Sequence, residues 1–285
     1  MVLLPWYAKM GAKLVLAHLP IPHGVWFRLG VFRHGQMQDF EYARGVFASH
    51  LKIAGMGSVA ANAGKVALEL GPGESLFTAV LARANGFSGS ILVDVGDFAL
   101  PRPEAYLELA GRLRAGGAAL PDLSACGDIP SLLGCLDSRY LTRGLESLRF
   151  LPDRSVDFVF SQAVLEHVRR REFAPTLKEI RRILKPGGVS THVIDLKDHL
   201  QLSLNNLRFR EPFWESDFVA SSGFYTNRLR YDELMALFAA AGFEAQVVST
   251  KTWPELPVPK RRLASHYRSM PDESLRISEL TVRLR

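Results

Sequence analysis

The feature that most constrains the fold of this chain is a glycine-rich turn between a short apolar run and a helical pattern. The apolar run covers residues 66–70, the turn reads GPGES over residues 71–75, and apolar residues then recur at helical spacing up to residue 85. Glycine at a strand end lets the backbone approach a ligand without a Cβ in the way, and the start of the following helix favours a carboxylate or phosphate. The turn therefore predicts a strand–turn–helix unit that binds a ligand.

Short apolar runs and helical patterns continue to alternate after this turn. The expected strands are residues 91–94, 156–161, 189–196, 245–250 and 275–284, and the expected helices are residues 104–113, 163–170, 174–184 and 231–241. This alternation predicts an α/β fold with a mostly parallel sheet and helices on both faces. No long helix separates the last two strands, so we expect one of them to run antiparallel.

The chain divides into zones of different composition. Residues 1–60 lean helical without strand-like alternation, and we expect a helical N-terminal extension there. Residues 61–285 carry the α/β pattern. Within them, residues 197–230 are rich in aromatic residues, Asn, Ser and Arg, and they interrupt the alternation. We expect this segment to be an insertion after the fifth strand that forms a lid on the substrate side.

Charge and apolar patterning bear on partners and location. The formal net charge is +6, and basic residues outnumber acidic ones after residue 250. Such a tail suits nucleic acid, an anionic membrane, an acidic substrate or simply solvent. Charges and prolines interrupt the apolar N-terminus, which makes a membrane span or a signal peptide a poor match. We expect a cytoplasmic protein whose N-terminal helix packs on the domain. The alternative is peripheral contact of that segment with the inner face of the membrane.

Two acidic residues flank the turn in a way that suits an adenosine-containing ligand. Glu69 precedes the glycines, and Asp94 ends the next strand, 21 residues after Gly73. An acid at this place can accept hydrogen bonds from two ribose hydroxyls. A dinucleotide fingerprint needs a third glycine where Leu76 stands, so the pattern disfavours a nicotinamide enzyme.

The acid-x-Gly-x-Gly pattern from Glu69 to Gly73 resembles motif I of the class I S-adenosylmethionine-dependent methyltransferases. Residues 148–168 resemble the segment around the fourth strand of that family, residues 177–188 its approach to the fifth, and residues 231–243 its penultimate helix. The resemblance covers roughly residues 64–285 with one insertion. It implies a Rossmann-like seven-stranded sheet, S-adenosyl-L-methionine as cofactor, and a methyltransferase activity.

The resemblance also implies which residues hold the cofactor. The turn would cradle the methionine part, the acid after the second strand would hold the ribose, residues 145–148 would flank the adenine, and the end of the fourth strand would lie by the methyl group. The cofactor-binding residues implied in this way are Glu69, Gly71, Gly73, Asp94, Glu146, Ser161 and Gln162.

Two carboxylates and an imidazole follow the fifth predicted strand, at the sheet edge where ligands of α/β proteins bind. Methylating a hydroxyl requires a group that takes its proton. We expect His199 to be this base, with Asp195 or Asp198 orienting it. We assign no metal site. The alternatives are a divalent metal ion held by these residues, or a helix cap with surface salt bridges.

The insertion combines aromatic rings with amide and guanidinium groups. Rings stack on the apolar face of a sugar, whereas amides and guanidinium groups bond its hydroxyls or a phosphate. The alternative is that the rings pack the lid onto the domain. The candidate substrate-binding residues are Arg208, Trp214, Tyr225, Asn227 and Arg228. The insertion and the N-terminal zone resemble methyltransferases that accompany bacterial surface-polysaccharide enzymes, which implies a sugar or glycan acceptor in polysaccharide biosynthesis, and a lipid-linked one would suit the apolar, cationic N-terminus.

The expected function is therefore O-methylation of a small-molecule or glycan acceptor. A nucleic-acid methyltransferase is the first alternative, motivated by the basic tail. It lacks the Asn/Asp-Pro-Pro-aromatic tetrapeptide after the fourth strand, where Ser161-Gln-Ala-Val stands instead. The second alternative is a non-catalytic binding module that kept the fold.

Overall fold

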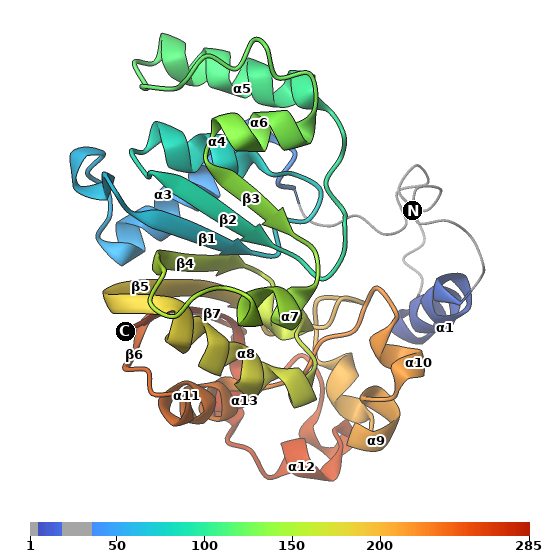
Figure 1. Ribbon diagram of the computed structural model, residues 1–285. Coiled ribbons are helices and arrows are strands. Elements are labelled where there is room, and N and C mark those ends of the chain that lie inside the picture. Colours follow the sequence, from blue (N-terminus) through green and yellow to red (C-terminus); the bar gives the residue numbers. More distant parts are fainter. Residues whose placement is uncertain (1–4, 19–35) are drawn as a thin grey trace.

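A single seven-stranded sheet organises the chain in the computed structural model, which describes residues 5–18 and 36–285 (Figure 1). The strand order is β3-β2-β1-β4-β5-β7-β6. The strands are β1 (Val66–Leu70), β2 (Gly89–Val93), β3 (Ser138–Leu141), β4 (Val156–Gln162), β5 (Leu184–Asp195), β6 (Ala245–Thr252) and β7 (Ile277–Leu284). Strands β1 to β5 are parallel, and β7 is antiparallel to β5 and β6. The predicted Rossmann-like α/β sheet with one antiparallel strand is confirmed.

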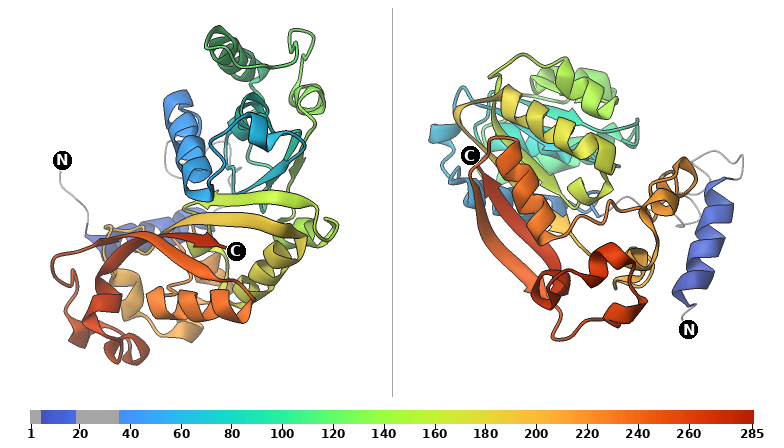
Figure 2. Two further views of the ribbon diagram at one scale, coloured as in Figure 1. Left: turned by 90° about the vertical axis from the view of Figure 1, so that its left-hand side faces the viewer. Right: turned by 90° about the horizontal axis from the view of Figure 1, so that it is seen from below.

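Helices cover both faces of this sheet, as Figure 2 shows. One face carries α3 (Phe40–Ala54), α4 (Phe77–Ala84), α5 (Pro103–Ala115) and α6 (Ile129–Cys135), and the other carries α7 (Gly144–Arg149), α8 (Arg170–Ile183) and α11 (Tyr231–Ala240). Successive side chains of a strand point to opposite faces. Ala67 accordingly packs in the first hydrophobic cluster and Leu68 in the second. The continuous apolar runs that predicted buried strands thus serve two cores.

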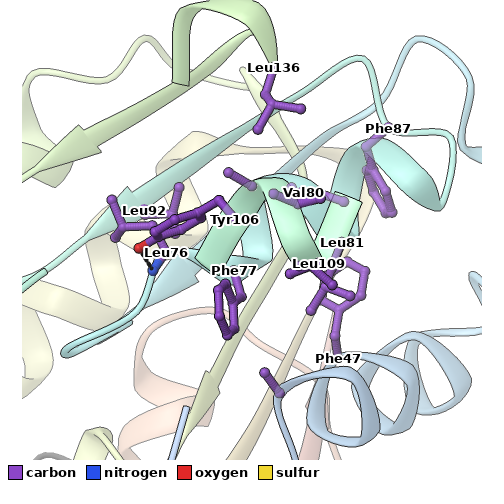
Figure 3. Packing of buried hydrophobic residues seen from close by; sticks show 14 of the residues in the cluster. Phe47, Leu76, Phe77, Val80, Leu81, Phe87, Leu92, Tyr106, Leu109 and Leu136 are labelled. Carbon is purple, nitrogen blue, oxygen red and sulfur yellow. Dashed lines mark hydrogen bonds between the residues drawn. The ribbon is translucent and has the colours of Figure 1, made fainter. Parts of the chain in front are cut away.

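Helix α4 is the centre of the first core (Figure 3). Its Val80 and Leu81 are buried with Phe47 of α3, and the hydroxyl of Tyr106 on α5 accepts a hydrogen bond from Leu76 N at 3.0 Å. Burying a side chain such as Phe47 contributes about 1.5–3 kcal/mol of stability. Helix α3 lies within the predicted helical extension of residues 1–60, and it packs against the sheet as part of this core.

A cap of short segments lies at the carboxyl ends of β4 and β5. We define the cap as residues 5–18, 197–230 and 253–276. Its elements are α1 (Trp6–Ala17), η3 (Asn205–Arg208), α9 (Glu211–Trp214), α10 (Asp217–Ala220), η4 (Lys260–Arg262), α12 (Ser265–Arg268) and α13 (Asp272–Arg276). Helix α1 packs through Met10 against Trp214 and Phe224 of the insertion, and it lies beside α10 in Figure 1. The sequence predicted the insertion but not the third cap segment, whose helices are too short to have a periodic pattern.

The segment after β4 differs from the prediction. A helix was expected over residues 163–170, but the structure has only a single 3₁₀ turn, η2 (Leu165–His167), before α8 begins. Ala163, with a left-handed φ of 54°, and Val168, which is extended with a φ of −65° and a ψ of 125°, limit the turn to three residues. Strain of this kind at a strand end often accompanies a functional site.

The two cysteines, Cys126 and Cys135, are free, and their sulfur atoms lie 3.0 Å apart near the β3 edge of the sheet. None of the helices in residues 5–18 and 36–285 has the length and apolar character needed to span a membrane.

Candidate active site

The glycine turn after β1 depends on two left-handed backbone positions. Gly71 has a φ of 68° and Gly73 one of 64°, a region that glycine alone adopts readily. Gly71 N donates to the carbonyl of Val93 at 2.8 Å, and a Cβ on Gly71 would lie 2.5 Å from a methyl group of Val164. The turn therefore runs close against the segment after β4, and a larger residue would not fit there.

Asp94 lies directly beside this turn, as the sequence predicted. Its carboxylate accepts hydrogen bonds from the backbone N–H of Gly73 at 2.9 Å and of Val95 at 2.7 Å. A carboxylate can accept about four hydrogen bonds, so these two are compatible with further bonds to ribose hydroxyls. The structure thus brings Gly73 and Asp94 together in the arrangement that an adenosine-containing cofactor requires.

Glu69 lies under the turn at the end of β1. Its side chain is buried, and its Oε2 has no hydrogen-bond partner. Burial raises the pKa of Glu69 to about 8, the Thr78 hydroxyl opposes this rise, and the negative charge of Asp94 adds to it. An orphaned buried carboxylate oxygen beside a glycine turn fits a ligand with N–H donors or a positive charge. The amino-acid end of S-adenosylmethionine has both.

The adenine side of the site contains a residue that the sequence reasoning missed. Val95 follows Asp94 and is 77% exposed, an unusual state for valine directly after a buried strand. It lines an open hollow of about 550 Å³ together with residues 142–146. Glu146, the predicted adenine contact, lies on this hollow and pairs with Arg149. The signal in the sequence for this surface was an apolar residue directly after Asp94, the residue expected to bind the ribose.

The end of β4 is tied to β5 and α3 through histidines. Ser161 is fully buried and its hydroxyl bonds Nδ1 of His192 at 2.7 Å, so this side chain faces the sheet interior instead of a ligand. Oε1 of Gln162 lies 3.2 Å from Nε2 of His50, whose Nδ1 bonds the hydroxyl of Thr191 at 2.8 Å. His50 was not predicted, and a lone histidine on an otherwise apolar helix face was its only signal.

Burial keeps both of these histidines neutral. It lowers the pKa of His50 to about 4, against the hydrogen bond that His50 donates to Gln162, and it lowers the pKa of His192, together with the nearby His50, to about 3. His50 therefore holds Gln162, a predicted cofactor residue, as an uncharged partner.

The predicted base lies at the carboxyl edge of the sheet. His199 is about one quarter exposed, and its Nε2 lies 3.9 Å from Oδ2 of Asp195. The other oxygen of Asp195 binds Nζ of Lys197 at 2.9 Å. Burial lowers the pKa of His199, the charge of Asp195 opposes this, and Lys13 of α1 adds to it. The imidazole is therefore neutral near pH 7, which is the form that accepts a proton.

Asp198 has a different environment from Asp195. Its buried carboxylate accepts hydrogen bonds from the backbone N–H groups of Leu200 at 2.9 Å, Gln201 at 2.6 Å and Asn205 at 2.7 Å. These bonds close the loop that begins the insertion. The geometry therefore favours the cap reading of Asp198, and Asp195 is the carboxylate that accompanies His199.

Two residues of η2 face the same place and were not among the predicted site residues. Glu166 is buried without a hydrogen bond of normal geometry to either carboxylate oxygen. The ring of His167 packs edge-on against that of His199, with 4.9 Å between centroids. Nδ1 of His167 bonds the carbonyl of Tyr225 at 2.9 Å, which ties η2 to the insertion.

The five predicted substrate-binding residues lie mostly inside the cap. Trp214 and Tyr225 belong to its hydrophobic cluster, and Asn227 is buried and bonds the backbone of η2. Arg228 is buried between the rings of Trp214 and Tyr267, at 5.2 and 5.5 Å from their centroids. These placements favour the lid-packing alternative for four of the five. Only Arg208 is half-exposed, with its guanidinium 5.3 Å from the centroid of Trp6.

Comparison with known proteins finds a recognised domain over part of the chain. Residues 129–191, which run from α6 into β5, match the model of a methyltransferase domain. The chain is 30% identical over 96 residues to the tRNA N(3)-cytidine methyltransferase METTL2 of Danio rerio, which covers 33% of this chain and 26% of that protein. It thus spans about a quarter of the length of this curated relative.

Solved structures of methyltransferases resemble the chain as well. A chain from the Haloferax volcanii complex of the Trm112 methyltransferase activator with a methyltransferase has 18% identity and a TM-score of 0.43, over 86% of this chain and 92% of that chain. A SAM-dependent methyltransferase from Archaeoglobus fulgidus has 13% identity and a TM-score of 0.46, over 87% and 96%. At such TM-scores these likenesses carry no functional information. The matched segment carries the description of a methyltransferase domain, and the geometry of the turn fits an adenosine-containing cofactor such as S-adenosylmethionine.

Proposed function

We propose that this chain is an S-adenosylmethionine-dependent methyltransferase and that it methylates a hydroxyl group of a sugar or glycan-type acceptor. The observation that carries the proposal is the neutral imidazole of His199 beside Asp195, at the sheet edge where the acceptor must meet the methyl group. A hydroxyl has to lose its proton as it is methylated, and a positioned imidazole or carboxylate accelerates this step by about 10²–10⁴-fold.

The cofactor-binding half orients its ligand mainly through backbone and carboxylates. When bound, the cofactor supplies a methyl group on a positively charged sulfur. Gly71 and Gly73 let the backbone approach its methionine part, and Glu69 offers a buried oxygen to the amino group. Asp94 accepts the ribose hydroxyls, and Val95 presents an apolar surface to the adenine.

The acceptor half handles the proton. The O–H bond of the acceptor breaks and its proton passes to the His199–Asp195 pair. The O–C bond forms as the S–C bond of the methyl donor breaks, so the charge on sulfur is neutralised. Lys197, 2.9 Å from Asp195 Oδ1, holds that carboxylate in place beside the imidazole.

A lipid-linked glycan is the form of acceptor that we favour, because of the character of α1. This helix contains no acidic residue, and it exposes Tyr7 and Val15, at 63% and 64%, on one stripe, while Nζ of Lys9 donates to the carbonyl of Leu200 in the cap at 3.3 Å. Such an exposed apolar stripe suits a membrane surface. Arg208, against Trp6 of the same helix, is the predicted substrate residue that can still reach an acceptor at this rim. Co-sedimentation with phosphatidylglycerol vesicles tests this, and a Tyr7→Glu/Val15→Glu variant that pellets as well as the wild type would count against it.

A second candidate is a nucleic-acid methyltransferase. It is favoured by the sequence match to a tRNA cytidine methyltransferase over 96 residues. Methylation of a ring nitrogen makes less demand on a base such as His199. This candidate predicts tRNA binding whose affinity falls steeply with salt.

Transfer of tritiated methyl groups from S-adenosylmethionine decides between the two acceptor classes. Nucleotide sugars and glycan lipids are offered in one set of reactions and total tRNA in another. We expect label in the sugar fraction, and a loss of about 10²–10⁴-fold in His199→Ala with unchanged cofactor affinity. His266→Ala, at an exposed histidine of α12, is the matched control. Label in tRNA alone, unaffected by His199→Ala, would replace the first function by the second.

A further inference from the structure

Three side chains that commonly bind metal ions converge between η2 and the loop after β5. Glu166 and His167 come from η2, and His199 comes from the loop. One potential ligand atom from each lies within 4.8 Å of the other two. This set shares only His199 with the metal alternative considered from the sequence, which involved Asp195 and Asp198.

Glu166 is the member of the cluster that most requires a partner. It is 2% exposed, and neither carboxylate oxygen makes a hydrogen bond of normal geometry. Burial raises its pKa well above the ordinary value, although its own backbone amide and that of Asp195 favour the charged form. A buried carboxyl group in a native protein is normally hydrogen-bonded, paired with a cation or bound to a metal ion.

His167 is oriented in the way that metal-binding histidines usually are. Its Nδ1 lies 2.9 Å from the carbonyl oxygen of Tyr225. A carbonyl can only accept, so Nδ1 carries the proton and the lone pair of the ring is on Nε2. Histidine ligands typically donate their second ring N–H to a carbonyl or carboxylate in this manner.

The η2 turn itself is held rigidly. Asn227 donates from its backbone to Glu166 O at 2.7 Å, and from its side chain to Leu165 O at 2.8 Å and Val168 O at 2.9 Å. Two ligands of the cluster are therefore preorganised by the cap, while His199 lies on a loop that can adjust.

We propose that Glu166, His167 and His199 form a binding site for one divalent first-row transition-metal ion, such as Zn²⁺, Mn²⁺ or Co²⁺. Two imidazole nitrogens and one carboxylate oxygen are ligands of such ions, whereas Mg²⁺ and Ca²⁺ prefer sets of oxygen atoms. In a closed site the ligand atoms lie roughly 3–3.5 Å apart, so small side-chain adjustments from within 4.8 Å complete the set. Three protein ligands leave at least one coordination position open, as catalytic sites do.

The open position gives the site a role in the reaction, and this part rests on the proposed function. An acceptor hydroxyl oxygen bound there would lose its proton more readily, because the ion stabilises the negative charge that develops on oxygen. With His199 acting as a ligand, Asp195 is the member of the pair that receives the proton. The metal ion would thus stabilise the charge on the acceptor oxygen, while the neighbouring Asp195 receives its proton.

Binding of Co²⁺ tests the site independently of catalysis, since its visible absorption bands report coordination by nitrogen and oxygen ligands. The full chain, freed of metal by chelation, is titrated with CoCl₂ and then with ZnCl₂. We expect one equivalent to bind, Zn²⁺ to displace Co²⁺, and affinity to fall by at least about 100-fold in His199→Ala and Glu166→Gln. The controls are His266→Ala and Glu172→Gln, at residues outside the cluster.

Folding failure cannot explain such a loss. Glu166→Gln keeps the shape of the side chain and places no ionisable group in the interior, and His199 is partly exposed. Absence of Co²⁺ bands in the wild type, or equal binding in wild type and Glu166→Gln/His199→Ala, would overturn the metal site. Methyl transfer by metal-free chain would then leave the proposed function intact. Metal binding without methyl transfer to any hydroxyl acceptor would instead remove the proposed function and leave the site.

Discussion

The cofactor half and the acceptor half of this site are built in different ways. The cofactor half is made by one turn and the next strand end: Glu69, Gly71, Gly73 and Asp94 lie within 26 residues, and backbone atoms make much of the surface. The acceptor half draws on η2, the loop after β5 and the cap segments 5–18 and 197–230, and it depends on side chains. A site of the first kind is encoded locally, whereas a site of the second kind exists only once distant segments have packed.

We expect the largest effect on stability from a substitution at Gly71 of the cofactor half. Comparison with a second glycine separates the cost of backbone conformation from that of steric fit. Gly71→Ala combines a positive φ with a Cβ 2.5 Å from Val164, and we expect it to destabilise the chain by about 3 kcal/mol or more and to abolish cofactor binding. Gly64→Ala is the matched control, because Gly64 also has a positive φ but has no atom within 4 Å of the added Cβ. It should cost only about 1 kcal/mol in urea denaturation.

Val164→Ala in the Gly71→Ala background should recover the steric part of this loss. Equal stability of Gly71→Ala and Gly64→Ala would show that the close approach of the turn to the β4 end has no energetic weight.

A substitution in the acceptor half should lower methyl transfer without lowering the affinity for the cofactor. Asn227→Ala removes hydrogen bonds to Leu165 O and Val168 O that hold η2, and loss of such buried bonds costs about 1–3 kcal/mol. We expect methyl transfer to fall by more than tenfold while calorimetric affinity for S-adenosylmethionine changes less than about twofold. A parallel loss of cofactor affinity would mean that the two halves are not independent.

The buried acid of the cofactor half should make stability depend on pH. Glu69 has an ordinary pKa of 4.5 and a folded pKa of about 8. Between these values the folded chain retains a proton that the unfolded chain has released, so its contribution to stability is complete below about pH 4.5 and is lost as pH rises to 8. Wild type should therefore lose stability relative to Glu69→Gln by up to about 1.4 kcal/mol per pH unit.

Urea denaturation at several pH values between 5 and 8 measures this difference. Glu104→Gln, at an exposed residue of α5, should give a profile parallel to that of the wild type. If Glu69→Gln also runs parallel, the carboxyl group is not protonated in the folded chain.

The smallest effect concerns the rim of the cofactor half. Glu146 is about half exposed and pairs with Arg149 one turn away, an arrangement that contributes less than about 1 kcal/mol. Glu146→Ala should leave stability within about 0.5 kcal/mol of the wild type and change cofactor affinity only a few-fold. A loss as large as that of Asp94→Asn would make Glu146 a principal adenine contact.

The same contrast explains what the sequence could and could not predict. Local periodicity was enough for β1, α4 and the glycine turn, and for the position of Asp94. It was not enough for the four-residue strand β3, which is too short to have a readable pattern. The left-handed conformation of Ala163, which replaces an expected helix by η2, depends on packing that no local rule describes.

Side-chain roles in the acceptor half were harder still to read. His50 bonds Thr191, 141 residues away, and His167 meets His199 from a different loop. Trp214 and Asn227 looked like sugar-binding residues because aromatic and amide groups serve both recognition and packing. Both side chains are buried within the cap, which favours a packing role. Burial depends on the whole fold, so the local sequence could not predict it.

The most direct test of the account is calorimetric titration of S-adenosylmethionine into wild type, Asp94→Asn and His199→Ala. We predict micromolar-range binding by the wild type, loss of at least about tenfold in Asp94→Asn, and no change in His199→Ala, because the two residues belong to separate halves of the site. Absence of binding to the wild type, or equal binding by all three proteins, would contradict the assignment of the glycine turn and Asp94 as the cofactor site.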